Sequence, residues 1–214
     1  MSTIVVLGVT GYAGGNITSE LLDRGHTVVG VARDTSKVTP RERLDVRGGS
    51  LYDPAFLTET VQGADVIVVA IHARNADEPD LESAVPALLD AAAAAGARLG
   101  VVGGAGSLLV AEGGPRVLDA GFPDEYRPEA EAHARVLDAL KSSGTAVDWF
   151  YVSPAGAFGS YNPGERTGTY RLGGDVLVTD AAGKSDISGA DYAIAFADEI
   201  EKPAHHRARF TVGY

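Results

Sequence analysis

The sequence predicts an α/β protein in which a doubly wound parallel sheet carries helices on both faces. Residues 3–14, TIVVLGVTGYAG, join an apolar strand to three glycines and the start of a helix. Strand-like and helix-like segments then alternate as far as residue 152, which is typical of a parallel sheet. Residues 64–71, ADVIVVAI, form the kind of continuous apolar run expected of a strand that is buried on both faces.

The first glycines follow the spacing Gly8-x-x-Gly11-x-x-Gly14, which indicates a dinucleotide-binding turn. Gly8 permits a tight turn, Gly11 removes a side chain that would keep a pyrophosphate away, and Gly14 lets the helix pack closely on the sheet. The pyrophosphate would then bind at the helix N-terminus, where unpaired N–H groups favour an anion. The alternative is a purely structural strand–turn–helix unit, because many of the 27 glycines mark only turns.

Turn-forming residues mark where the other predicted helices and strands begin and end. Gly25, for example, ends the helix that follows the glycine turn. Further strands are expected over residues 27–31, 44–46, 64–71, 97–102, 146–152, 176–178 and 209–212, and further helices over residues 54–61, 79–95, 128–143 and 190–200. Residues 154–174 are rich in Gly, Pro and Tyr. We therefore expect one domain, residues 1–214, in which residues 154–214 form a small lobe over the ligand crevice at the carboxyl ends of the strands.

Composition excludes several classes of function. The 29 acidic and 18 basic residues give a formal charge of -11, which argues against binding to nucleic acid or an anionic membrane. Without cysteine the chain has no disulfide, no thiol nucleophile and no iron–sulfur cluster. No apolar run approaches the ~20 residues of a membrane span, and the N-terminus has the pattern of a strand rather than of a basic leader. We expect a soluble, cytoplasmic protein.

The end of the second strand bears on the choice of cofactor. An acidic residue there takes a ribose 2′-hydroxyl, whereas an arginine accommodates a 2′-phosphate. Here the strand ends in Arg33, Asp34 follows, and Lys37 lies one turn later. This favours NADP, with NAD possible. In the alternative interpretation Arg33 is simply solvated and Asp34 caps a short helix at residues 35–38.

Several segments together resemble a known family. They are GVTGYAG, VARD, LDVRGG, VVGGAGSL, SPAGAFGSYNPGERTGTYRLGGD, ISGADYAIAFADEIEKP and RFTVGY. The chain resembles the NADH-flavin reductase group of atypical short-chain dehydrogenases/reductases, related to biliverdin-IXβ reductase and the NmrA-like NAD(P)H-binding proteins. The resemblance implies a Rossmann-type sheet with NAD(P)H across Gly8 to Gly14. It implies Arg33 at the adenosine phosphate, and Asp45 and Val46 near the adenine.

The resemblance further implies that residues 70–72 and 103–105 line the nicotinamide side, with residues 154–156 near the carboxamide. The cofactor-binding residues it implies are Gly8, Thr10, Gly11, Tyr12, Ala13, Gly14, Arg33, Asp45, Val46, Ala70, Ile71, His72, Gly103, Gly104, Pro154 and Ala155.

The superfamily's usual proton relay is absent from the sequence. That relay pairs a tyrosine with a lysine four residues later, and here no tyrosine has such a lysine. The candidate catalytic residues are Tyr126, His72 and Ser107. Each of these residues also has a non-catalytic interpretation. Tyr126 would be a surface or cleft-lining aromatic, and His72 would be a strand-end residue hydrogen-bonded to the neighbouring loop. Ser107 would be part of a turn.

The remaining polar residues point to no metal site. His205 and His206 are consecutive and would face opposite ways in an extended chain, so they cannot share a metal ion. His133 is expected to be exposed or to line the cleft. Glu165 and Arg166 are expected to form an ion pair in a lid or to contact substrate.

The sequence therefore predicts an NAD(P)H-dependent oxidoreductase that transfers hydride to a flavin, a quinone or a similar small acceptor. Two alternatives stay open, a non-catalytic NADP(H) redox sensor and a nucleotide-sugar epimerase or dehydratase. The expected partner is the small-molecule hydride acceptor, and the chain is expected to be a monomer or a homodimer.

Overall fold

The computed structural model describes residues 1–75 and 77–214, and in that part of the chain eight strands form one sheet. The strands are β1 (Thr3–Leu7), β2 (Thr27–Ala32), β3 (Leu44–Gly48), β4 (Val66–Val69), β5 (Arg98–Val102), β6 (Trp149–Ser153), β7 (Arg171–Gly173) and β8 (Ala208–Gly213). Their order is β3-β2-β1-β4-β5-β6-β8-β7, and only β7 runs antiparallel to its neighbour. The order 3-2-1-4-5-6 is that of a Rossmann fold, which confirms the predicted fold class.

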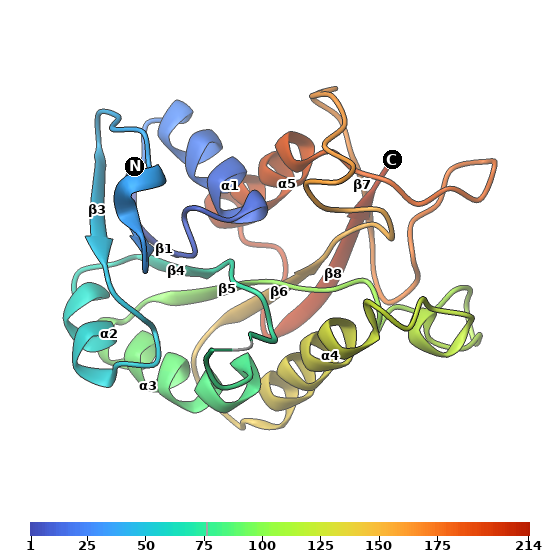
Figure 1. The fold of residues 1–214 in the computed structure, drawn as a ribbon, viewed down its shortest axis with the longest axis horizontal. Helices are drawn as coiled ribbons and strands as arrows, with labels where there is room; N and C mark the ends of the chain where they lie inside the picture. Colours follow the sequence, from blue (N-terminus) through green and yellow to red (C-terminus); the bar gives the residue numbers. More distant parts are fainter. Residues whose placement is uncertain (76) are drawn as a thin grey trace.

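Helices cover both faces of the sheet (Figure 1). On one face lie α1 (Tyr12–Asp23) and α5 (Gly189–Glu201), which pack against each other. On the other face lie α2 (Pro54–Thr60), α3 (Val85–Ala95) and α4 (Arg127–Ser142). Three short 3₁₀ turns complete the described secondary structure, namely η1 (Thr35–Lys37), η2 (Leu81–Ala84) and η3 (Val117–Asp119).

The core consists of two apolar layers that the sheet separates. In β1, Ile4 and Val6 belong to the layer under α1 and α5, whereas Val5 and Leu7 belong to the layer under α2, α3 and α4. This alternation follows from the period of two in a strand. Because both faces are covered, all four residues of β4 are buried. Burial on both faces explains why the sequence of β4 is a continuous apolar run.

Two glycines of the first turn are required by packing. A Cβ at Gly8 would lie 2.3 Å from the Ala70 carbonyl oxygen, and the Gly8 φ of 100° is in the left-handed region. A Cβ at Gly14 would lie 2.1 Å from the Gly8 carbonyl oxygen. These contacts hold the turn against the end of β4 and bring α1 close to the sheet.

Two predicted elements differ from the structure. The helix predicted from residue 79 begins at Val85, because residues 81–84 form the tighter turn η2 and Pro86 lies in the first turn of α3. The strand predicted at residues 176–178 is wrong. Val176 makes only an isolated bridge with Leu109, whereas residues 171–173 pair with β8. Gly173 allows this pairing, since a Cβ there would lie 2.9 Å from side chains of Thr211 and Val178.

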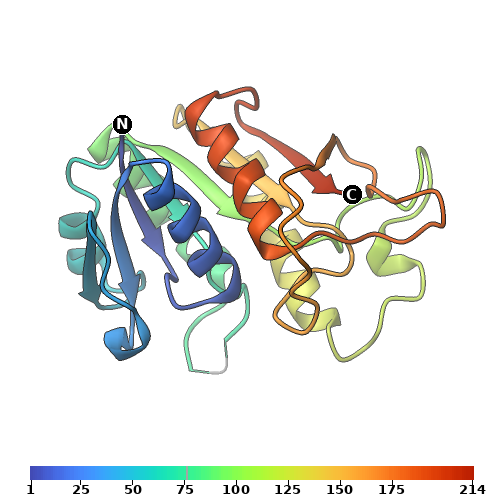
Figure 2. The same cartoon turned by 90° about the horizontal axis from the view of Figure 1, so that it is seen from above.

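The segment after β6 contributes to the main layers as well as to a peripheral region. Its helix α5 packs on α1, and its strand β8 lies beside β6 in the sheet. Residues 154–188, which include β7, form long loops at one end of the sheet (Figure 2). Among the helices of the described chain, none combines the length and apolar character needed to cross a membrane.

Candidate functional site

A pocket opens at the carboxyl ends of β1, β2 and β4. In Figure 2 the arrowheads of β1 and β2 point to the lower edge of the view, where the loops after these strands lie. The pocket encloses about 730 Å³, counted out to its open mouth. It is lined by Leu7, Gly8, Thr10, Gly11, Val31, Ala32, Arg33, Gly49, Ser50, Leu51, Tyr52, Ala70, Ile71, His72, Asn75 and Glu78. Its place at the carboxyl ends of the strands is that of ligand sites in open α/β sheets.

The N-terminus of α1 offers unpaired hydrogen-bond donors beside this pocket. The helix begins after Gly11, which has no side chain to cap it. Within the described chain, the N–H groups of Tyr12, Ala13 and Gly14 have no protein acceptor, and the first bonded amide is Gly15, 2.8 Å from the Gly11 oxygen. Such free amides and the helix dipole favour a bound anion.

Tyr12 itself connects two helices. Its hydroxyl accepts a hydrogen bond from the Gly189 N–H at 2.8 Å and donates to the Pro163 oxygen at 3.1 Å. Its ring also packs edge-on against Phe158. The side chain thus ties the start of α1 to the start of α5.

Arg33 and Glu78 both line the pocket. The Arg33 side chain is 58% exposed, and its Nη1 lies 3.6 Å from Glu78 Oε2. The Ser50 hydroxyl donates to Glu78 Oε1 at 2.8 Å. Burial and the negative charges of Glu78 and Asp80 raise the pKa of Tyr52 to about 12. Asp34 caps η1, as the alternative interpretation predicted, by accepting the Ser36 N–H at 3.0 Å.

Asp45 and Val46 lie outside the pocket lining. Asp45 is exposed and pairs with Arg47 Nε at 3.0 Å. The wall beyond β3 consists of residues 49–52 instead. The sequence contains a signal for this wall. Gly48 and Gly49 stand at the end of β3, and a glycine turn likewise follows β1.

His72 lies at the end of β4 and contacts a residue that sequence reasoning missed. Its Nδ1 lies 3.2 Å from Oε1 of Glu129, in the first turn of α4. The same carboxylate accepts the N–H groups of Ala73 and Arg74, each at 2.8 Å, and lies 3.3 Å from His133 Nε2. Glu129 therefore holds the loop after β4 against α4.

These contacts change both pKa values. Burial raises the pKa of Glu129, but hydrogen bonds from His133, His72 and Ala73 outweigh it and hold the pKa far below its usual 4.5. The hydrogen bond to Glu129 raises the pKa of His72 above its usual 6.5, although the side chain is 85% exposed. His133, expected to be exposed or cleft-lining, is buried beside Glu129.

Glu129→Gln is expected to lower the free energy of unfolding by about 1–3 kcal/mol near pH 5.5, because donors to a charged acceptor lose part of their bonds. A carboxyl group whose pKa is lowered in the folded state stabilises the protein at pH values above its unfolded-state pKa. The difference in the free energy of unfolding between the variant and wild type should therefore shrink as the pH falls below 4.5. The pKa of His72 is raised in the folded state, so this residue stabilises the folded protein fully below pH 6.5 and less at higher pH. The difference in the free energy of unfolding should therefore also shrink toward pH 8.

Urea unfolding at pH 3, 5.5 and 8 measures this profile. Glu131→Gln is the matched control, since Glu131 is exposed on the same helix. A difference from wild type that stays constant over this pH range would contradict the assigned role of Glu129.

The loop after β5 is fixed by buried groups. The Tyr151 hydroxyl accepts the Gly104 N–H at 3.1 Å and donates to the His133 oxygen at 3.0 Å. The Ser107 hydroxyl accepts a hydrogen bond from Arg209 Nη1 at 3.3 Å, and Arg209 is itself paired with Asp175. Ser107 is thus engaged by β8 in this structure. Across the carboxyl end of β6, Pro154 and Ala155 are buried.

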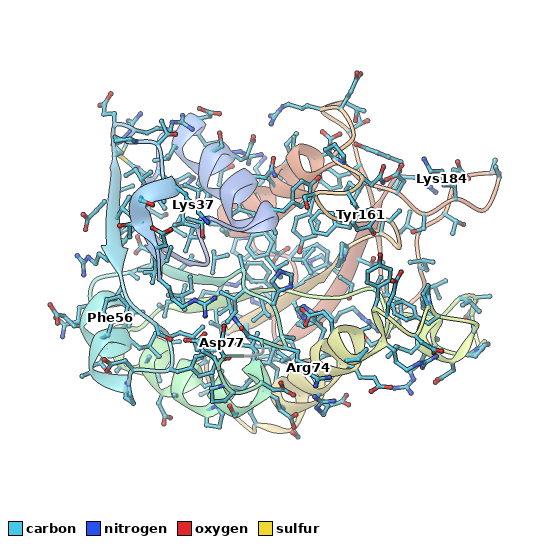
Figure 3. The ribbon with its side chains drawn as sticks, viewed as in Figure 1. Lys37, Phe56, Arg74, Asp77, Tyr161 and Lys184 are labelled. Atoms are coloured by element: carbon cyan, nitrogen blue, oxygen red, sulfur yellow. The ribbon has the colours of Figure 1, made fainter. Side chains whose placement is uncertain are left out.

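Tyr126 and Tyr161 are two exposed tyrosines of the described chain. Tyr126 directly precedes α4 and is 55% exposed, and Tyr161, in the loops after β6, is 71% exposed. Figure 3 shows Tyr161 on the α5 side of the sheet and Arg74, in the loop after β4, on the α4 side. Of the three candidate catalytic residues, His72 is bound to Glu129 of α4, Tyr126 precedes that helix, and Ser107 is held by β8.

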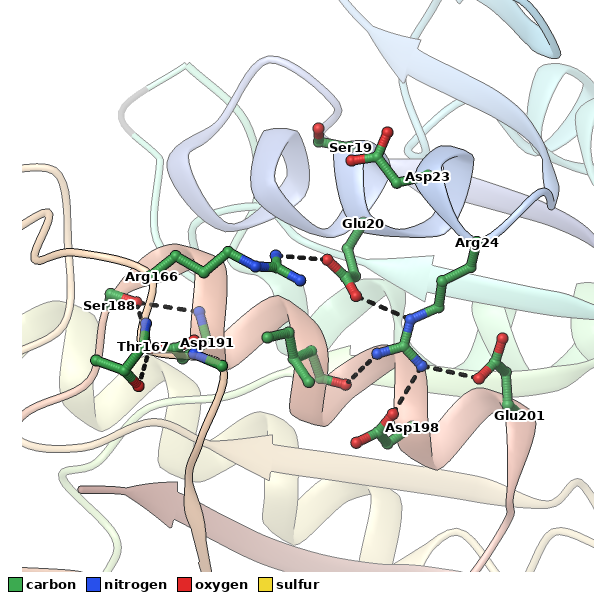
Figure 4. Close-up of polar contacts among 12 residues, drawn as sticks. Ser19, Glu20, Asp23, Arg24, Arg166, Thr167, Ser188, Asp191, Asp198 and Glu201 are labelled. Carbon is green, nitrogen blue, oxygen red and sulfur yellow. Dashed lines mark hydrogen bonds and ion pairs between the residues drawn. The ribbon is translucent and has the colours of Figure 1, made fainter.

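Glu165 and Arg166 do not pair with each other. Arg166 Nη1 donates to Glu20 of α1 at 2.7 Å, and Glu20 also binds Arg24 (Figure 4). The neighbouring backbone is held by the fully buried Asp191 of α5, which accepts the N–H groups of Thr167 and Gly168, each at 2.8 Å. The predicted pairing is therefore wrong, because these loops bind the α1 and α5 layer instead.

The other histidines have structural partners. His205 Nδ1 lies 2.7 Å from Glu199, and His206 Nδ1 lies 2.9 Å from Asp148. In the described residues no group of three or more His, Cys, Asp or Glu side chains is arranged to hold a metal ion.

The fold and the pocket define a class of protein. A Rossmann sheet with a glycine turn, free amides at α1 and an arginine in the pocket lining suits a dinucleotide, whose pyrophosphate would bind at the helix N-terminus.

Comparison with known families agrees with this class. A family model described as NAD(P)H-binding matches residues 8–203, so the chain belongs to this NAD(P)H-binding family. The uncharacterized protein YwnB of Bacillus subtilis (strain 168) is 37% identical over 212 residues, which cover 98% of this chain and 97% of YwnB.

Two solved structures are also similar. The "putative epimerase" from Bacteroides thetaiotaomicron has 36% identity and a TM-score of 0.89, over 100% of this chain and 97% of that one. The "putative NADH-flavin reductase" from Streptococcus pneumoniae TIGR4 has 33% identity and a TM-score of 0.86, over 100% of this chain and 99% of that one. The resemblance inferred from the sequence motifs is confirmed.

Proposed function

We propose that this chain is an NAD(P)H-dependent reductase that passes a hydride to a small acceptor such as a flavin or a quinone. The observation that carries the proposal is the N-terminus of α1, whose free N–H groups lie beside a pocket that Arg33 also lines. The match to the NAD(P)H-binding family and the similarity to the Streptococcus structure support it.

Residues at the pocket would bind and orient the cofactor. The amides of residues 12–14 would hold the pyrophosphate, and Gly8, Thr10 and Gly11 would form the surface against which it lies. The exposed Arg33 guanidinium would hold a 2′-phosphate, so we propose NADP as the cofactor, with NAD as the second choice. The nicotinamide would supply the hydride when bound.

Beyond the pyrophosphate site, residues at the ends of β4, β5 and β6 would surround the nicotinamide and the acceptor. Residues 70–72, 103–104 and 154–155 lie at these strand ends. His72 would hold a proton at its imidazole, because the Glu129 carboxylate favours the charged ring. Tyr126 offers an exposed ring on which a flat acceptor could stack.

The chemistry proposed needs little acid catalysis from the protein. A nucleotide-sugar epimerase or dehydratase, the alternative inferred from the fold, would need the tyrosine and lysine relay that this sequence lacks. Hydride transfer to an oxidised flavin or quinone depends mainly on stacking and alignment, which the pocket residues can provide.

Tyr126→Phe is expected to lower flavin-dependent NADPH oxidation by less than about tenfold, below the 10²-fold or more typical of a lost general acid. The ring that stacks is retained, and only the hydroxyl is removed. NADPH oxidation would be followed with FMN, riboflavin and a simple quinone, for wild type and for the Tyr126→Phe, Ser107→Ala and His72→Ala variants.

A hundredfold loss in Tyr126→Phe alone would point to acid–base catalysis and contradict the proposed mechanism. Tight NADPH binding without turnover of any acceptor would instead support a redox sensor that reports the state of NADP(H) to a protein partner.

A further inference from the structure

Arg33 has a fixed negative neighbour at the pocket wall. Its Nη1 lies 3.6 Å from Oε2 of Glu78, and both residues line the pocket. The two side chains differ in exposure, because 58% of the Arg33 side chain is exposed but only 20% of Glu78. The arginine can therefore move toward a ligand, whereas the carboxylate stays within the wall.

Glu78 is held in place by two further contacts. Its Oε1 accepts the Ser50 hydroxyl at 2.8 Å, which leaves Oε2 to face Arg33. Its backbone forms an antiparallel bridge with Asn75, another residue of the pocket lining. The charge of Glu78 also contributes to the raised pKa of Tyr52, which lies in the same wall. The carboxylate is thus a built part of the pocket.

A carboxylate in this position has opposite effects on two nucleotides. A 2′-phosphate that approaches Arg33 meets the negative charge of Glu78 and must compete with it for the guanidinium. A ribose with a free 2′-hydroxyl carries no charge to be repelled, and a hydroxyl can donate to a carboxylate. Partial burial keeps this interaction from being fully screened by solvent.

We propose that Glu78 is a specificity-determining residue that lowers the preference of the pocket for a 2′-phosphate and so lets the chain bind both NADPH and NADH. The inference rests on the proposed function, since it concerns the same nucleotide pocket. Glu78 belongs to the segment between β4 and η2, at a distance of 45 positions from Arg33, and no motif of the sequence marks it.

The test compares Glu78→Gln with wild type by calorimetric titration of NADPH and NADH. The probes adenosine 2′,5′-bisphosphate and AMP isolate the effect of the 2′-phosphate. Glutamine keeps the shape of the side chain and an oxygen that can accept the Ser50 hydroxyl, so the fold should be retained. NADPH and the bisphosphate should bind about five- to tenfold more tightly to the variant. NADH and AMP should bind with equal or lower affinity.

Asp77→Asn is the matched control, because it removes the same charge from the adjacent, exposed position, which is not among the residues that line the pocket. It should change the affinity for each nucleotide by less than about twofold. In an Arg33→Ala background, Glu78→Gln should have a smaller effect, because the competition for the guanidinium is gone and only the direct repulsion of the 2′-phosphate remains.

An equal gain for both nucleotides, or the same gain in Asp77→Asn, would overturn the role of Glu78 and leave the proposed function standing. Failure of wild type to bind either dinucleotide would overturn both the proposed function and this inference.

Discussion

Gly11→Val is expected to abolish binding of both nicotinamide dinucleotides while the chain stays folded. The backbone at Gly11, with φ -75° and ψ 164°, is extended and open to any residue. A Cβ there would lie 3.3 Å from the Gly8 oxygen, so that carbonyl must move by a few tenths of an ångström. The two methyl groups of valine would then occupy space in front of the free amides of α1. Calorimetry should show affinity at least about 100-fold weaker, or no binding.

Gly14→Ala provides the contrast, because its Cβ would lie 2.1 Å from the Gly8 oxygen within the packed turn. Both variants should lose stability in thermal unfolding, but Gly14→Ala should lose more than Gly11→Val, because its Cβ contact is far closer. Normal NADPH affinity in Gly11→Val would show that the pyrophosphate does not bind at this turn.

Asp191→Ala is expected to cost about 1–3 kcal/mol of stability, the range for leaving a buried hydrogen-bonding group without its partner. The carboxylate is fully buried and accepts hydrogen bonds from the Thr167 and Gly168 amides and from the Tyr214 and Ser188 hydroxyls. Its loss would leave these donors without an acceptor and release the backbone next to Arg166.

Two measurements check this result. Urea unfolding should show the loss of stability, and brief trypsin digestion should cut after Arg166, a position that the contact with Glu20 and the Asp191 bonds protect in wild type. Asp138→Ala, at an exposed position of α4, should change neither property. Unchanged stability and no cut after Arg166 would show that Asp191 does not hold this loop.

The sheet could be predicted from the sequence because its signals are local. A strand that is buried on both faces must be apolar along its length. A tight turn that joins a strand to a closely packed helix needs glycines at fixed positions. Both features stand in residues 3–14 and 64–71. Strand β7 was missed because its pairing depends on β8, about 40 residues later, and on the small size of Gly173.

The candidate site was only partly predictable for the same reason. The glycine turn, Arg33 and the residues after β4 were expected, since each follows a strand end. Glu129 gave no such signal, because an acidic residue in the first turn of a helix is commonly explained by the helix dipole. Glu129 and Ala73, which are hydrogen-bonded, are 56 residues apart in the sequence. Glu78 and Ser50, which are also hydrogen-bonded, are 28 residues apart. Only the folded chain brings these groups together.

The strand order at one end of the sheet constrains how the chain acquires its structure. β8 lies between β6 and β7, although it comes after both in the chain. Among the described strands β7 pairs with β8 alone, so residues 171–173 can join the sheet only once residues 208–213 are present as a strand. One end of the loops beside the proposed acceptor site is thus attached to the sheet by the last strand of the chain, and a chain that ends before residue 208 would lack that attachment.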